Sequence, residues 1–125
     1  MLKYPTAMGV TLALLAGLSL AHAQKATERF IPIGKSPGLS DKYTKIGTID
    51  AVNTQDRTIT MSAPSGTYTA RIAEETRIWL DKSKINSTNE EGTFSDLQAG
   101  RMVEVKYKDN DPEGPAEWIK VQIAE

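Results

Sequence analysis

The fold of this chain is decided by residues 57–72, RTITMSAPSGTYTARI. Two runs in this stretch alternate apolar and polar residues, and alternation with a period of two places one set of side chains on each face of a strand. The apolar set consists of Ile59, Met61, Tyr68, Ala70 and Ile72. Between the two runs, the proline and glycine at 64–66 (PSG) are typical of a hairpin turn. The stretch therefore predicts a β-hairpin with one buried face.

Similar alternation predicts four more strands along the chain. We expect them at residues 47–53 (GTIDAVN), 76–80 (TRIWL), 101–108 (RMVEVKYK) and 117–123 (EWIKVQI). Their inward residues are expected to be Ile78, Leu80, Val103, Val105, Tyr107, Ile119, Val121 and Ile123.

Two connections between these strands differ in character. Residues 81–92 (DKSKINSTNEEG) are polar and have no period, so we expect a loop of 12 residues, which is long for a compact domain. Residues 94–100 (FSDLQAG) predict a single helical turn, with Ser95 as its N-cap and Gly100 as its end.

These elements predict an all-β domain over residues 46–125. An open sheet of five or six short strands exposes two edges, and closure into a barrel removes both. Three strands, a short helical connection and two further strands follow the order of an OB-like barrel. We therefore expect a small five- to six-stranded OB-like barrel with one short helical turn, and a small β-sandwich is the alternative.

The segment ahead of this domain, residues 24–45, has prolines and glycines among polar residues and no sustained period. We expect it to be a flexible N-terminal arm. Its one apolar cluster, residues 30–33 (FIPI), either docks on the domain or binds a partner, and the sequence leaves both alternatives open.

Residues 1–23 have the features of a cleaved signal peptide. Lys3 supplies the positive start, residues 8–20 form an apolar stretch of 13 residues, and residues 21–23 (AHA) match the signal peptidase pattern. A helix of 13 residues spans only about 20 Å, whereas the hydrocarbon core of a membrane is about 30 Å thick. We therefore expect cleavage before Gln24, a periplasmic or secreted product, and no stable membrane insertion after cleavage. A retained membrane anchor is the alternative.

Cleavage would remove the only histidine, His22, from a chain that has no cysteine. The mature protein would then lack imidazole and thiol groups, which are the usual general bases, nucleophiles and soft-metal ligands. Removal of 23 residues leaves 102, and the formal net charge changes from −1 to −2 because Lys3 leaves. A near-neutral chain lacks the basic surface that binds nucleic acid. We expect one small domain with no disulfide, no cofactor and no nucleic-acid partner.

Three runs carry a resemblance to a known kind of protein: residues 47–61 (GTIDAVNTQDRTITM), 66–78 (GTYTARIAEETRI) and 94–107 (FSDLQAGRMVEVKY). A G-x-I-x-A-V strand precedes a T-I-T strand, and a D-L-x-x-G turn precedes a V-x-V strand. This pattern resembles the small secreted bacterial OB-like domains of unknown function. The resemblance covers about residues 46–123 and implies the fold and the compartment.

The opening strands are also similar to those of the periplasmic copper-binding barrels of metal-efflux systems. Those proteins hold Cu(I) with a histidine and two closely spaced methionines, beside a tryptophan. This chain has no histidine beyond residue 22, and its Met61 and Met102 lie 41 positions apart. The copper site is therefore not implied for this chain, although a periplasmic metal-handling protein is kept as the alternative function.

Two tryptophans indicate a binding surface. If Ile78 and Leu80 face inward, Trp79 faces outward, and the same rule places Trp118 outward. Exposed indole rings present a large apolar area, and OB barrels bind ligands across one sheet face. We expect a ligand-binding face formed by Trp79, Trp118, Arg77, Lys106 and Lys120. In the alternative, the arm or the 81–92 loop covers the rings, or a bulge turns one of them into the core.

No other cluster predicts catalysis or metal binding. Residues 109–114 (DNDPEG) imitate the start of a calcium loop, but the twelfth position is Lys120 instead of glutamate. The pairs at 74–75 and 90–91 are glutamates in predicted turns, and neighbours on a strand point to opposite faces. A Ser83–Lys84 dyad would have nothing to position it. We therefore expect a non-enzymatic binding module whose partner is another periplasmic protein or an extended ligand.

Overall fold

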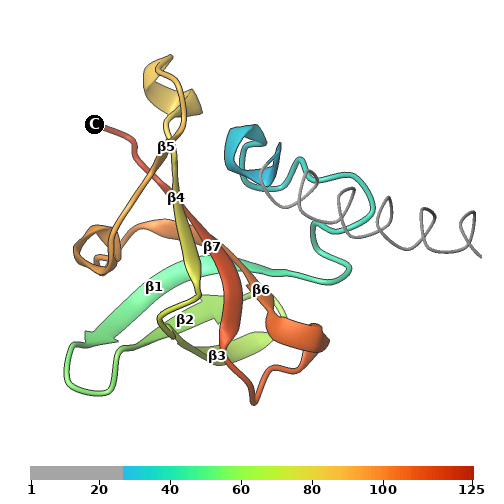
Figure 1. Cartoon of the computed structure of the whole chain (residues 1–125), viewed down its shortest axis with the longest axis vertical. Coiled ribbons are helices and arrows are strands. Elements are labelled where there is room, and N and C mark those ends of the chain that lie inside the picture. The colour runs from blue at the N-terminus through green and yellow to red at the C-terminus, as the bar shows by residue number, and fades with distance from the viewer. Residues whose placement is uncertain (1–26) are drawn as a thin grey trace, which may run out of the picture.

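The computed structural model describes residues 27–125 of the chain (Figure 1). The predicted signal peptide and the first residues of the predicted arm lie outside this range. Within it the protein is mostly β, which confirms the all-β prediction. No helix among the described residues is long and apolar enough to cross a membrane.

Seven strands form one mixed sheet. They are β1 (Lys45–Asn53), β2 (Thr58–Ala63), β3 (Gly66–Arg71), β4 (Arg77–Asp81), β5 (Glu90–Glu91), β6 (Met102–Tyr107) and β7 (Ala116–Gln122). Their order across the sheet is β3-β2-β1-β6-β7-β4-β5. Neighbouring strands are antiparallel except β4 and β7, which are parallel.

The sheet has seven strands instead of the five or six expected, because β5 was not predicted. This two-residue strand lies in the predicted polar loop and pairs with Trp79 and Leu80 of β4. Its two residues are both exposed glutamates, so no apolar alternation marks it in the sequence. Backbone pairing with β4 forms the strand instead.

Four short 3-10 helices connect the strands: η1 (Glu28–Phe30), η2 (Ser83–Ile85), η3 (Phe94–Asp96) and η4 (Lys108–Asn110). The predicted helical turn corresponds to η3, but its N-cap is Thr93 and not Ser95. The Asp96 carboxylate accepts a hydrogen bond from the Thr93 backbone N–H at 2.8 Å and completes a capping box.

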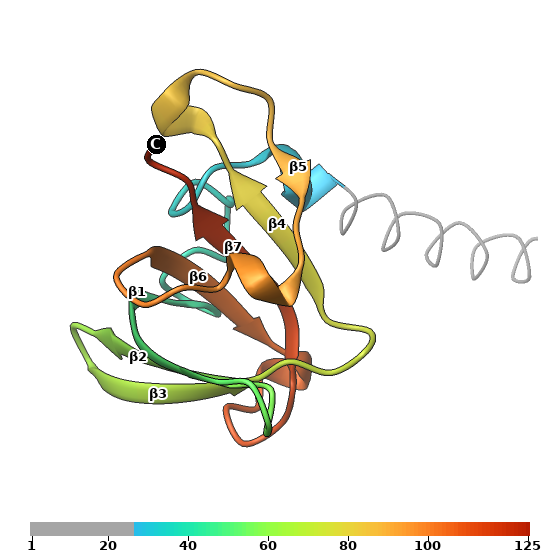
Figure 2. The same ribbon diagram turned by 90° about the vertical axis from the view of Figure 1, so that its left-hand side faces the viewer.

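The apolar core lies between the two halves of the curved sheet. Figures 1 and 2 show β2 and β3 on one side of the molecule and β4 and β7 on the other. The core consists of Ile49, Ile59, Met61, Ala70, Ile72, Ile78, Leu97, Val103, Val105, Tyr107, Ala116, Ile119 and Val121. Tyr68 and Leu80 are partly buried against it. Alternation therefore predicted the inward faces of β2, β3, β4, β6 and β7 correctly.

One glycine allows β1 and β2 to approach closely. A Cβ atom at Gly47 would lie 2.1 Å from the Ser62 backbone oxygen, which is far inside contact distance. Past this point, the pairing of β1 with β2 shifts register between Ile49 and Ala51, as at a β-bulge. The close approach and the irregularity bend β1 where it passes from β6 to β2.

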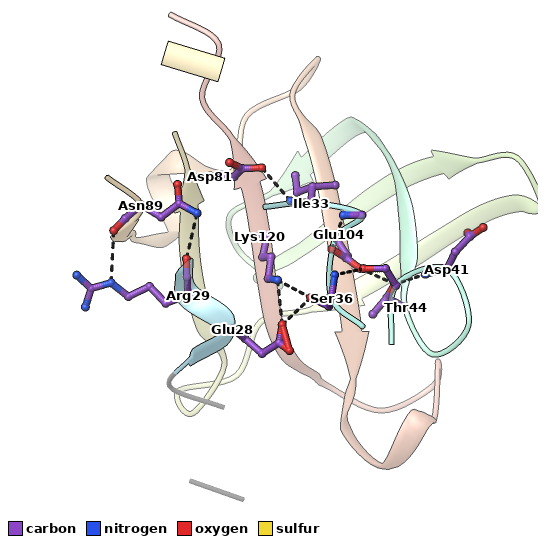
Figure 3. Close-up of polar contacts among 12 residues, drawn as sticks. Glu28, Arg29, Ile33, Ser36, Asp41, Thr44, Asp81, Asn89, Glu104 and Lys120 are labelled. Atoms are coloured by element: carbon purple, nitrogen blue, oxygen red, sulfur yellow. Dashed lines mark hydrogen bonds and ion pairs between the residues drawn. The ribbon is translucent and has the colours of Figure 1, made fainter. Parts of the chain in front are cut away.

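Residues 27–44, which we call the N-terminal strap, lie against the sheet (Figure 3). The strap has no strand, and its backbone makes a series of turns. Its helix η1 lies against β4 and β5, and hydrogen bonds join the strap to β4, β6 and β7. The strap therefore packs on the sheet, because buried polar side chains of β4, β6 and β7 hold it.

Candidate functional site

Five outward side chains of β4, β6 and β7 are buried although they point away from the apolar core. They are Trp79, Asp81, Glu104, Trp118 and Lys120, and we call them the covered face. Each is at most 2% exposed. Three of the five carry a formal charge, which is rare for buried positions unless the charges are paired. The strap lies over this face and supplies the partners.

The five predicted site residues share this side of the sheet. Trp118 pairs in register with Arg77 of β4 on one side and with Lys106 of β6 on the other. Trp79 pairs in register with Lys120 of β7. Strand alternation therefore grouped these side chains correctly, since paired residues on neighbouring strands point to the same face.

Trp79 and Trp118 are buried and not exposed, in agreement with the alternative in which another segment covers the two rings. Their exposed fractions are 2% and 1%. The ring centroids lie 5.8 Å apart with a tilt of 39°, and the Lys120 ammonium lies 4.8 Å from the centroid of the Trp118 ring. Helix η1 of the strap lies against β4. The physical reason is that the two indole rings present a large apolar area. Removal of this area from water by another segment is favourable.

Arg77 and Lys106 lie at the margin of the covered face. The Arg77 guanidinium forms an ion pair with Glu91 of β5 at 2.7 Å, and its side chain is 50% exposed. The Lys106 ammonium forms an ion pair with Glu117 at 3.5 Å and is mostly buried. Both cations therefore have carboxylate partners from the sheet itself, in contrast to Lys120.

Lys120 is held by two side chains of the strap (Figure 3). Its ammonium donates to Glu28 Oε1 at 3.1 Å and to Ser36 Oγ at 2.8 Å. The Ser36 hydroxyl in turn donates to the same Glu28 oxygen at 2.5 Å. The three groups form a closed triangle of charge-assisted hydrogen bonds between β7 and the strap.

Glu104 of β6 accepts three hydrogen bonds, and all three donors belong to the strap. Gly34 N–H donates to Oε1 at 3.0 Å. The hydroxyls of Ser40 and Thr44 donate to Oε2 at 2.7 and 2.8 Å. Glu104 and Lys120 are register partners on neighbouring strands, yet each obtains its hydrogen bonds from the strap.

A glycine turn in the strap presents consecutive amides to the sheet. Ile33 N–H donates to Asp81 Oδ2 at 2.9 Å, and the next amide, that of Gly34, donates to Glu104. Gly34 has a φ of +82°, in the left-handed region that glycine tolerates best. A turn bond from Lys35 N–H to Pro32 O at 3.1 Å closes this bend. These contacts recognise the backbone of the strap and not its side chains.

The loop after β4 holds the first turn of the strap. The Asn89 side-chain amide donates to Arg29 O at 3.1 Å. The Asn89 side-chain oxygen accepts Lys82 N–H at 2.7 Å, so the same residue also ties its own loop. The predicted loop 81–92 therefore takes part in covering this side of the sheet, together with the strap.

The contact of Ser36 with Lys120 has the residue types of a Ser–Lys dyad. However, the Lys120 ammonium is ion-paired with Glu28, and the Ser36 hydroxyl is directed at the same carboxylate. Ser36 is 3% exposed. The arrangement connects the strap to the sheet. The dyad considered at Ser83 has a different geometry as well, since the Ser83 hydroxyl donates to Asp81.

The acidic turn after β6 is an exposed hairpin connection. Asp111 accepts the Glu113 backbone N–H at 3.0 Å and the Gly114 N–H bonds to Asp111 O at 3.0 Å. Across residues 27–125, no three His, Cys, Asp or Glu side chains are grouped so as to hold a metal ion. Lys120, at the twelfth position of the calcium-like pattern, lies in the covered face instead.

One buried polar atom of the covered face has no partner. The Trp79 indole nitrogen, Nε1, is buried and has no hydrogen-bond acceptor, and in the described part of the chain it is the one side-chain atom in that condition. An unsatisfied buried donor is unfavourable by about 1–3 kcal/mol. The strap therefore satisfies the three charged residues of the face but leaves the indole N–H unsatisfied.

The residues that sequence reasoning missed are those that join the strap to the sheet. They are Glu28, Ser36, Ser40, Thr44, Asp81, Asn89 and Glu104. The two members of the Lys120–Glu28 pair are 92 positions apart, so no local spacing links them. One signal was present: Glu104 and Lys120 occupy outward positions between valines and isoleucines, although such charges usually contact water.

No protein-family model, curated protein or solved structure matches this chain. Its function is therefore inferred from the geometry of the covered face.

Proposed function

We propose that this protein is a non-enzymatic binding module of the periplasm or the extracellular space, and that its covered face binds a segment of another protein. One observation carries the proposal: Asp81 and Glu104 accept hydrogen bonds from two consecutive backbone amides of the strap. Backbone contacts depend little on the side chains of the bound segment. A face that holds one irregular segment in this way is suited to hold another.

We infer that the sheet closes into an OB-like barrel. β3 pairs with β2 along its whole length, and β2, β1, β6 and β7 follow as neighbours in the sheet. An isolated parallel bridge lies between Arg71 and Pro115. This bridge joins the end of β3 to the residue before β7, and so links the two ends of the ladder β3-β2-β1-β6-β7. This link supports a barrel over the β-sandwich alternative.

The compartment is proposed from the leader and from the resemblance to small secreted OB-like domains. Expression of the full sequence in a bacterial host, followed by fractionation and intact-mass measurement, tests it. We expect a periplasmic product that begins at Gln24. A cytoplasmic product that retains residues 1–23 would contradict the proposal.

Nuclear magnetic resonance tests the binding function directly. The chain has two tryptophans, and both lie in the covered face, so the two indole N–H signals report on it. We expect these signals to shift when a peptide mixture from digested periplasmic proteins is added. Glycan fragments, Cu(I) and Ca²⁺ are added separately to the same sample. Stoichiometric Cu(I) binding would favour the metal-handling alternative, and a response limited to residues 109–114 with Ca²⁺ would overturn the assignment of the site.

A further inference from the structure

We propose that the N-terminal strap is an exchangeable occupant of the covered face. The partner that replaces it is a peptide segment with a carboxylate for Lys120 and a carbonyl oxygen for the indole N–H of Trp79. This inference rests on the binding function proposed above and names the chemistry of the partner.

The three charged side chains of the covered face are held to the strap by polar contacts. Lys120 forms an ion pair with Glu28 and donates a hydrogen bond to Ser36 of the strap. Glu104 accepts three hydrogen bonds from the strap, and Asp81 accepts one. Removal of these charges from water offsets much of the attraction that the contacts supply. The apolar core on the other side of the sheet includes no residue of the strap. The strap can therefore leave the face while the core keeps the sheet folded.

The strap also fits the face incompletely. It satisfies the charged side chains, but Trp79 Nε1 stays buried without an acceptor. A segment that presents a carbonyl oxygen to this N–H removes an unfavourable feature that the strap leaves in place. We expect such a segment to bind about tenfold more tightly than one with the sequence of the strap.

The charges of the face select the partner. Lys120 is paired with one carboxylate, Glu28, and the Ser36 hydroxyl lies between the two groups. A segment without a carboxylate at this position would leave the Lys120 ammonium buried and unpaired, which is strongly unfavourable. Conversely, Glu104 and Asp81 require donors, which backbone amides and hydroxyls provide. The partner is therefore an acidic segment that contains serine or threonine.

Tethering favours the strap over a free peptide. A segment joined to the face by a short linker has an effective concentration of about a millimolar. A test of exchange therefore requires a variant in which the strap is weakened. Glu28→Gln with Ser36→Ala removes the carboxylate charge and the hydroxyl that hold the Lys120 ammonium. Glu74→Gln with Ser87→Ala is the matched control, because it makes the same two kinds of substitution at exposed residues.

The experiment uses protein purified after expression of the full sequence. The probe is a fluorescein-labelled peptide with the sequence of residues 27–44, which has no tryptophan. Peptide binding is measured by anisotropy, and exposure of the face is measured by the emission of Trp79 and Trp118. We expect red-shifted emission in the weakened variant and peptide binding at least tenfold tighter than to the wild type or the control. A peptide with Glu28→Gln should bind at least tenfold more weakly.

The carbonyl requirement has its own test. Peptides with asparagine or glutamine at each position from 27 to 31 offer an additional carbonyl near η1. We expect at least one of them to bind the weakened variant about tenfold more tightly than the parent peptide, and the gain should disappear when the variant also carries Trp79→Phe. If none of these peptides gains affinity, or if the gain persists with Trp79→Phe, the partner does not present a carbonyl oxygen to Trp79.

Two negative results are distinguishable. If the emission of the weakened variant stays as in the wild type and the peptide does not bind, the strap is fixed and exchange is wrong. The proposed binding function is then judged separately, by whether the two indole N–H signals respond to the periplasmic peptide mixture. If the emission shifts to the red but no peptide binds, the face opens without binding. That outcome would overturn both the exchange and the proposed function.

Discussion

Lys120 is the residue on which the covered face most depends. Its ammonium forms a closed triangle of hydrogen bonds with Glu28 and Ser36 and lies over the ring of Trp118. The residue is 1% exposed. Loss of one partner from a buried ion pair that cannot separate destabilises a protein by about 3–5 kcal/mol. Here the strap can leave, and the Glu28 carboxylate can return to water.

We therefore predict a moderate effect for Lys120→Met. The free energy of unfolding in urea should fall by about 1–2 kcal/mol, less than the value for a trapped pair because Glu28 becomes hydrated. In contrast, Ile119→Ala leaves a cavity in the core and should lower it by about 2–5 kcal/mol. Lys108→Met, on the exposed surface, should change it by less than about 0.5 kcal/mol. Equal losses for Lys120→Met and Ile119→Ala would contradict a separable strap.

Tyr107 links the core to β3. Its hydroxyl donates to Thr69 O at 2.8 Å, and burial raises the pKa of Tyr107 to about 12. The unfolded chain has a tyrosine pKa of about 10. Because the folded value is the higher one, this group contributes its full stability below pH 10 and loses it as the pH rises from about 10 to about 12.

The corresponding prediction concerns the slope of stability with pH. The wild type should lose more stability between pH 10 and 12 than Tyr107→Phe, which has no phenol to ionise at that position. Tyr43→Phe is the control, since Tyr43 is exposed, and it should keep the wild-type slope. Urea unfolding at several pH values measures the difference, and parallel slopes for wild type and Tyr107→Phe would refute the assignment.

At the scale of elements, the close approach of β1 to β2 depends on one missing side chain. A methyl group at Gly47 would meet the Ser62 backbone oxygen, which cannot move without breaking the strand pair. We predict that Gly47→Ala lowers the free energy of unfolding by about 1–3 kcal/mol. The thermal midpoint should fall as a result. Gly114→Ala is the matched control because its new methyl group would make only ordinary contacts. An unchanged midpoint for Gly47→Ala would mean that the strands do not approach in this way.

Element prediction succeeded where burial on one side creates a pattern. Ile59 and Met61, and likewise Val103 and Val105, enter the core because alternate residues of a strand share a face. β5 has no such pattern and forms by backbone pairing with β4. The sequence predicts Ser95 as the helix cap, but Thr93 takes that position because Asp96 completes the capping box with it.

At the scale of the whole molecule, the protein has two layers of different chemistry on the two sides of β4, β6 and β7. The apolar layer joins the halves of the sheet, and the polar layer joins the sheet to the strap. Local opening of a weakly held segment requires less free energy than global unfolding. The strap should therefore open independently of the core.

Hydrogen exchange measured by nuclear magnetic resonance checks this independence. The amides of Ile33 and Gly34, which donate to the sheet, should exchange faster than the core amides of Ile59 and Val121. Glu28→Gln with Ser36→Ala should accelerate the strap amides and leave the core amides unchanged. A common rate for all four amides would show that strap and core unfold together.

The alternation of apolar and polar residues determined, without any tertiary information, where the long strands lie and which side chains β2, β3, β4, β6 and β7 turn inward. It also placed Trp79, Trp118 and Lys120 on the opposite face, because the two faces of a strand follow directly from the period of two. Only the tertiary structure decided that this face is covered. The contacts of Lys120 with Glu28 and Ser36 join residues 92 and 84 positions apart. Such pairs form when the folded sheet brings them together, and no periodicity along the chain encodes which segment will cover an outward charge.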